Sequence, residues 1–153
     1  LTKNSEQYEL IKRDPSPEII SNFVEEVLRY SSPSSNMFRR ATKDVEMHGI
    51  KIPKDSILFA RFASANQDEE KFPDPYKFDI TRENLKDQVA FGKGVHHCLG
   101  AALSRREMNI GSRVIFERLE NFRLSEGAPP PEFSANALLH GLTGLQIDFD
   151  RKA

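Results

Sequence analysis

The sequence contains a single cysteine, Cys98, and no tryptophan among its 153 residues. One cysteine cannot form a disulfide within the chain, which excludes the disulfide-rich class of small secreted domains. A lone cysteine outside that class raises the question of a reactive or metal-bound thiol. Cys98 is therefore the first candidate functional residue, and its sequence surroundings have to account for it.

The chain also lacks an excess of charge of either sign and a long apolar run. Its 22 basic and 23 acidic residues give a formal net charge of -1. Because these charges are mixed along the chain, no charged segment indicates nucleic acid or a membrane surface as a partner. The longest nearly apolar stretch, 135–147, is interrupted by polar residues and glycines and is too short to cross a bilayer as a helix. The first residues show no signal-peptide pattern.

Hydrophobic periodicity predicts two main helices. The first runs from about Ser16 to Tyr30, where apolar residues recur at helical spacing after a serine N-cap and a first-turn proline. The second runs from about Leu99 to Leu119 on the same criterion. A short helix is expected over 5–12. With 38% hydrophobic residues, the chain is long enough for the core of one domain covering 1–153.

The remaining segments predict short strands and one long irregular stretch. Apolar residues in 38–62 alternate between turn residues, which favours a small β-sheet. Residues 66–88 are charged and proline-containing with little periodicity, so we expect an irregular meander. Long loops without regular structure are uncommon in compact domains unless they serve a function. The tail from Phe122 predicts short strands around the prolines at 129–131.

The segment from Phe91 to Gly100 surrounds the cysteine with the pattern Phe, Gly, any, Gly, any, His, any, Cys, any, Gly. It resembles the cysteine-ligand loop of the cytochrome P450 family and fills every fixed position of that pattern. Glycines permit a tight turn, and a cysteine at the N-terminus of the following helix is favoured as the thiolate. Two alternatives are a buried structural cysteine and a zinc site formed with His96 and His97.

The resemblance implies haem b as the cofactor and Cys98 as both the axial iron ligand and the catalytic residue. A thiolate ligand supplies electron density that favours cleavage of the bond between the two oxygens of dioxygen. The resemblance assigns His96 and Arg39 to the haem propionates, with Arg40 as an adjacent competitor. Phe91 is expected beside the sulfur, and the cofactor-binding set also includes two glycines, Gly92 and Gly100.

A second motif resembles the Glu-any-any-Arg helix of the same family. Glu26 and Arg29 are spaced to meet on one helix face, and the resemblance adds Arg82 from the meander as a third member. Most pairs at this spacing are solvated surface contacts, which is the alternative reading. We expect the three to form one buried, hydrogen-bonded structural triad. Loss of Glu26 should then destabilise the chain far more than loss of its neighbour Glu25.

The predicted fold class is α+β and mainly helical. The chain is similar to the C-terminal portion of a P450, with two main helices, a small β-sheet, the meander and the cysteine loop. The N-terminal portion with the oxygen-side helix is absent. The resemblance implies a cytoplasmic, bacterial-type monooxygenase that acts on a small, mainly apolar organic substrate with O2. A ferredoxin- or flavodoxin-type electron donor would dock on a basic patch of Lys93, Arg105 and Arg106. A non-catalytic P450-like domain and a fragment of a split or cleaved enzyme are the rival hypotheses.

Overall fold

Three helices form one end of the molecule. In the computed structural model, which describes residues 4–152, they are α1 (Ser5–Arg13), α2 (Pro17–Ser31) and α4 (Ala101–Arg118). The hydroxyl of Ser16 accepts a hydrogen bond from the backbone N–H of Ile19 at 3.4 Å, and Pro17 occupies the first turn of α2. Both features favour the start of a helix at this point. The main predicted helices are therefore present in the fold.

The core lies where α1, α2 and α4 meet the meander. One apolar cluster joins residues from all four segments, and aromatic side chains dominate it; Phe23 and Phe116 lie 5.3 Å apart in an edge-to-face arrangement. The buried members are Ile11, Ile20, Phe78, Ile80 and Phe116. A second cluster connects α2 to the cysteine loop through Val24, Leu28 and Ala90. Burial of these side chains fixes α2 between the meander and α4.

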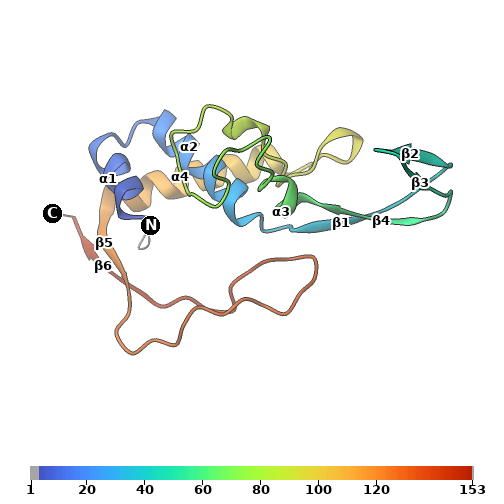
Figure 1. Cartoon of the computed structure of the whole chain (residues 1–153). Helices are drawn as coiled ribbons and strands as arrows, with labels where there is room; N and C mark the ends of the chain where they lie inside the picture. The colour runs from blue at the N-terminus through green and yellow to red at the C-terminus, as the bar shows by residue number, and fades with distance from the viewer. Residues whose placement is uncertain (1–3, 153) are drawn as a thin grey trace.

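The strands form three separate two-stranded sheets rather than one small sheet. β1 (Asn36–Arg40) pairs with β4 (Ile57–Arg61), and β2 (Val45–Met47) pairs with β3 (Ile50–Ile52), both antiparallel. The region in which a small sheet was predicted therefore holds two separate two-stranded ladders. The β2–β3 pair is a hairpin carried beyond the β1–β4 ladder, and the four strands extend away from the helices (Figure 1). A short helix, α3 (Phe62–Ala65), follows β4.

The tail folds back along the molecule. β5 (Leu119–Leu124) continues directly from α4 and pairs with β6 (Ile147–Arg151). Between them, the loop returns to the start of β1, where the N–H of Ser35 donates to the carbonyl of Leu138 at 2.9 Å. Figure 1 shows this segment running below the helices. Within residues 4–152, no helix is both long and apolar enough to cross a membrane.

Candidate functional site

The cysteine loop is a tight turn that precedes α4. Gly92 and Gly94 have φ angles of +70° and +77°, and Gly94 begins the 3-10 helix η2 (Gly94–His96) that precedes the cysteine. The backbone N–H of Cys98 donates to the carbonyl of Phe91 at 2.9 Å and closes the loop. α4 begins at Ala101, two residues later than the sequence predicted, so the cysteine lies in the turn and not within the helix.

The glycines of this loop serve different purposes. Gly92 is required for its backbone angle, because its φ is left-handed; a Cβ there would lie at an ordinary contact distance of 3.5 Å from the ring of Phe62. Gly100, in contrast, has a φ of -82°, which any residue adopts. A Cβ at this position would lie 3.9 Å from the sulfur of Cys98. At this distance a Cβ would make an ordinary van der Waals contact, so neither the backbone angle nor the available space requires glycine at position 100.

A cavity of about 490 Å³ opens at the cysteine loop. It brings together Cys98, His96, Phe91 and Gly92 from the loop with Arg39 from β1. Apolar side chains from α2, β1, α3, α4 and the segment before the cysteine loop complete the wall; the main ones are Leu28, Met37, Phe62, Ala90 and Met108. The volume and the mostly apolar lining with a few convergent polar groups are typical of a cofactor or small-molecule site.

The structure distinguishes the two adjacent arginines of β1. Arg39 lines the cavity, with its guanidinium donating to the carbonyl of Phe38 at 2.8 Å. Arg40 points elsewhere, because alternate residues of a strand face opposite sides, and it forms an exposed ion pair with Asp55. His97 likewise does not line the cavity, whereas His96 does. Over residues 4–152, no group of three histidine, cysteine or acidic side chains is placed to hold a metal ion.

Glu26 and Arg29 form a fully buried ion pair on α2. Both side chains are 0% exposed, and two nitrogens of Arg29 donate to the two carboxylate oxygens at 2.6 and 2.8 Å. Such a bidentate pair is strong and fixes both side chains. The remaining donors of Arg29 reach backbone carbonyls of the meander, at Asn66 (2.8 Å), Pro75 (2.9 Å) and Lys77 (3.2 Å).

Arg82 joins this pair from the meander in a different way from that predicted. Its Nε lies 3.5 Å from Glu26 and makes no hydrogen bond, so the contact is an ion pair only. Its terminal nitrogens donate to the carbonyls of Asp74 at 2.7 Å and Lys77 at 2.9 Å, and to that of Pro73. Glu26 also accepts the backbone N–H of Asp79 at 2.7 Å. The three charged side chains therefore hold the meander mainly through its backbone.

Other buried polar side chains hold the same segment, and sequence reasoning missed them. Asn66 is fully buried, donates to the hydroxyl of Ser32 at 2.9 Å and accepts the N–H of Val89 at 2.7 Å. Gln7 of α1 accepts the N–H of Ile80 at 2.9 Å. No local pattern distinguishes these amides from surface ones, because their partners lie up to 73 positions away in the sequence.

Glu25 is not the solvated neighbour that the sequence suggested. It is only 9% exposed, and it accepts hydrogen bonds from Gln88 at 2.8 Å and from Arg105 at 2.6 Å. Consequently Arg105 is paired inside the fold, and the predicted basic patch is wrong in this member; Lys93 and Arg106 are exposed. Loss of Glu25 would itself strand a partly buried charge, so it cannot serve as a mild comparison for loss of Glu26.

Asp79 is one of two meander aspartates, with Asp87, whose pKa is lowered. Burial alone would raise its pKa, but hydrogen bonds from the side chain and backbone of Thr81, and Lys77 beside it, outweigh burial and hold the pKa below its usual value. Thr81 donates to the Asp79 carboxylate through its N–H at 2.9 Å and through its hydroxyl at 2.6 Å. The ionised form of Asp79 therefore stabilises the turn beside Glu26.

Comparison with known proteins places this geometry in a family. The family model described as Cytochrome P450 matches residues 17–148, a span that contains the cavity, the triad and the whole meander. The chain belongs to the cytochrome P450 family. Among curated P450 relatives, 6-deoxyerythronolide B hydroxylase from Saccharopolyspora erythraea is 35% identical over 98% of this chain, and the steroid C26-monooxygenase of Mycobacterium tuberculosis is 40% identical over 97%.

Solved P450 structures share the fold. The cytochrome P450-153 from Novosphingobium aromaticivorans superposes with a TM-score of 0.90 at 33% identity and covers 98% of this chain. The fold is thus that of part of a P450, as the sequence predicted. The chain spans 36% of the length of the hydroxylase, 39% of the steroid monooxygenase and 37% of the solved P450-153 chain.

The residues around the cavity fit the haem iron that the P450 family implies. A single sulfur donor, Cys98, faces a mostly apolar space, and two nitrogen-bearing side chains, Arg39 and His96, lie on its wall. A haem presents iron to a thiolate, apolar ring surface to apolar side chains, and two carboxylates to cations or hydrogen-bond donors. Each of these requirements has a candidate residue on the wall of this cavity.

Proposed function

We propose that this chain is the haem-thiolate portion of a P450 monooxygenase, which inserts one oxygen atom of O2 into an organic substrate. One observation carries the proposal: a cavity of about 490 Å³ gathers Cys98, His96, Phe91 and Arg39 from two segments far apart in the sequence. Relatives named as a hydroxylase and a steroid monooxygenase support the reaction class.

In this proposal, Cys98 is the axial ligand and the catalytic residue. Haem b, when bound, supplies the iron centre at which dioxygen is activated. The hydrogen bond from the backbone N–H of Cys98 to the carbonyl of Phe91 closes the loop and fixes the position of the residue that carries the sulfur. Arg39 and His96 neutralise the two propionates, because buried carboxylates need cationic or hydrogen-bonding partners. The triad of Glu26, Arg29 and Arg82 is a structural support that does not touch the reacting atoms.

The proposed substrate is a small, mainly apolar organic molecule, and the proposed electron donor is a ferredoxin- or flavodoxin-type protein. The lining is largely apolar, and a solved relative, P450BioI, was captured with hexadec-9Z-enoic acid ligated to acyl carrier protein. Lys93 and Arg106 are exposed near the cysteine loop and give an acidic donor a basic surface to approach.

The proposal is tested by measuring whether Cys98 ligates the haem iron as a thiolate. Reduction of the haem-loaded protein under carbon monoxide should give the red-shifted Soret band of a thiolate-ligated haem, and Cys98→Ser should abolish that band. The matched control is His97→Ala, since His97 is in the same loop, is exposed and does not line the cavity. It should leave the band in place. A Cys98→Ser protein with an unchanged spectrum would sink the proposal.

A further inference from the structure

Arg105 of α4 connects the helix α2 to the cysteine loop. Its Nε and one terminal nitrogen donate to the two carboxylate oxygens of Glu25 at 2.6 and 3.3 Å. The Glu25 side chain is 11% exposed, and that of Arg105 is 33% exposed. Gln88 donates to the same carboxylate at 2.8 Å and accepts the N–H of Ala90 at 2.6 Å. The guanidinium is therefore held in one plane by a carboxylate that is itself fixed.

The other side of this guanidinium faces the ring of Phe91. The central carbon of the guanidinium lies 4.7 Å from the ring centroid, within the range of a cation–π contact. Phe91 lines the cavity beside Cys98, and its carbonyl accepts the N–H of Cys98 at 2.9 Å. Contacts thus run without a gap from Glu25 through Arg105 and Phe91 to the backbone of the cysteine.

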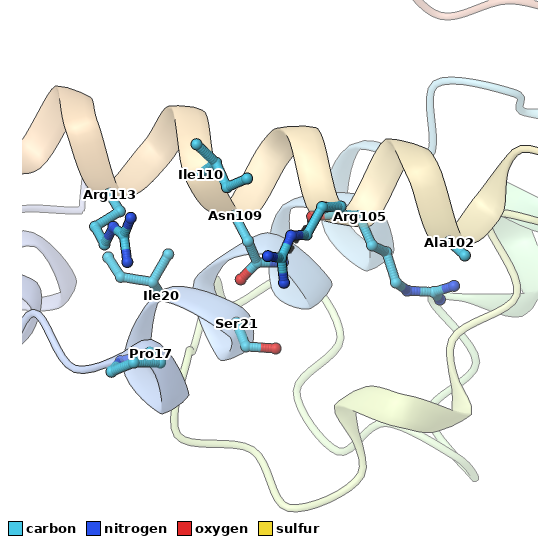
Figure 2. Close-up of a pocket in the computed structure, with 9 residues that line it drawn as sticks. Pro17, Ile20, Ser21, Ala102, Arg105, Asn109, Ile110 and Arg113 are labelled. Atoms are coloured by element: carbon cyan, nitrogen blue, oxygen red, sulfur yellow. Dashed lines mark hydrogen bonds between the residues drawn. The ribbon is translucent and has the colours of Figure 1, made fainter.

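Arg105 also lies on the wall of a groove of about 510 Å³ between α2 and α4. Figure 2 shows this groove, with Arg105, Asn109 and Arg113 on α4 and Pro17, Ile20 and Ser21 on α2. Among the residues that the structure describes, none lines both the groove and the Cys98 cavity. The side chain of Asn109 donates to the carbonyl of Arg105 at 2.8 Å. Arg105 therefore contacts the loop through Phe91 and is not among the residues that line the Cys98 cavity.

We propose that Arg105 is a positioning residue: clamped by Glu25 and Gln88, it holds the ring of Phe91 and thereby fixes the turn that carries the Cys98 sulfur. This inference rests on the proposed function, in which Cys98 is the haem ligand. The simpler reading is an ion pair that only joins α2 to α4. The two interpretations predict different results for a lysine at position 105. Lysine can pair with Glu25, but it lacks the planar guanidinium that binds a carboxylate with two hydrogen bonds and stacks on an aromatic ring.

The experiment compares Arg105→Lys with Arg106→Lys. Both variants keep the net charge, and Arg106 is the exposed neighbour on the same helix. Because Cys98 is the only cysteine, its alkylation by iodoacetamide can be followed in the haem-free protein without interference. Arg105→Lys should raise the alkylation rate about threefold or more, which is the order expected from loss of a cation–π contact. It should also reduce the thiolate-type carbon monoxide band after haem loading. Arg106→Lys should match the wild type in both measurements.

A second pair of variants keeps the test decisive. Phe91→Leu should change both readouts in the same direction, and the double variant with Arg105→Lys should add little, because the two side chains act as one unit. Additive effects would overturn the inference. So would an Arg105→Lys protein that behaves like the wild type, or an equal response from Arg106→Lys. Each of these results leaves the ligand role untouched, since that role is decided separately by Cys98→Ser.

Discussion

Glu26 carries the negative charge that the two arginines of the triad share. It is fully buried, with Arg29 at 2.6 Å and Arg82 at 3.5 Å, so two guanidinium groups share one carboxylate. Glu26→Gln removes that charge with little change of volume and strands both arginines. We expect a loss of about 3–5 kcal/mol in the free energy of unfolding, measured by urea denaturation. Glu18→Gln, at an exposed position in the first turn of α2, should cost no more than about 1 kcal/mol. Equal, small losses from the two variants would contradict the structural role.

Arg39 and Arg40 provide a matched pair for testing the propionate assignment. Arg39 lines the cavity, and Arg40 is paired with Asp55 on the surface. Arg39→Ala should weaken haem binding by ~10-fold or more, the order of one hydrogen bond to a charged group. Arg40→Ala should leave haem affinity unchanged, because exposed ion pairs contribute little. The measurement is a Soret titration of the haem-free proteins. A larger loss of haem affinity from Arg40→Ala than from Arg39→Ala would assign the propionate contact to Arg40 instead of Arg39.

The sequence was informative at the residue scale only where a dense local pattern exists. The residues around Cys98 resemble the P450 cysteine loop at six fixed positions within ten residues, and that resemblance implied the thiolate ligand. The choice between Arg39 and Arg40 needed the strand register, and the burial of Glu25 needed its partners on α4 and the meander. Those contacts join residues that are distant in the chain, so no local window of sequence contains them.

The meander is the element whose order depends most on ionised groups. The pKa of Asp79 is held below its usual value, so its ionised form adds stability above the pKa of an unfolded aspartate, roughly 3.9. That contribution is lost as the pH falls through the lower, folded pKa. Asp79→Asn should therefore lower stability at neutral pH, and its deficit against the wild type should shrink below about pH 4. Urea unfolding across this range tests the prediction, with the exposed Glu83→Gln as control. A deficit that is constant with pH would contradict it.

The helices and the short strands differ in how well the sequence predicted them. α2 and α4 repeat an apolar face over four or five turns, and each began and ended within two residues of the prediction. The strands of 36–61 are three to five residues long, too short for alternation to reveal partners. Their division into two ladders follows from the register between β1 and β4, in which Phe38 lies opposite Phe59 with ring centroids 4.7 Å apart.

At the scale of the whole molecule, many large apolar side chains are exposed. Leu99 is 103% exposed, Leu103 is 64% exposed, and Ile110 also faces solvent on α4. Apolar surface of this extent normally contacts other protein. A polypeptide of these 153 residues alone should therefore self-associate, bind haem weakly and reduce oxygen without coupled product, because Cys98 on the wall of the cavity is exposed to water. Sedimentation and a reductase-coupled product assay test this. Coupled hydroxylation by the isolated polypeptide would contradict it, and activity restored by an added N-terminal P450 segment would support it.

The triad arginines bind the meander through main-chain oxygens, at Asn66, Pro73, Asp74, Pro75 and Lys77. Every residue has a main-chain carbonyl oxygen, so these hydrogen bonds do not depend on which side chain the residue carries. A segment held in this way can change most of its side chains without changing its path. Drift of the meander's sequence among homologues should thus be rapid at exposed positions such as Glu69 and Glu70. The two arginines and Glu26 should tolerate almost no replacement. The path of the meander is therefore determined by three side chains, two of which lie on α2 and not in the meander itself.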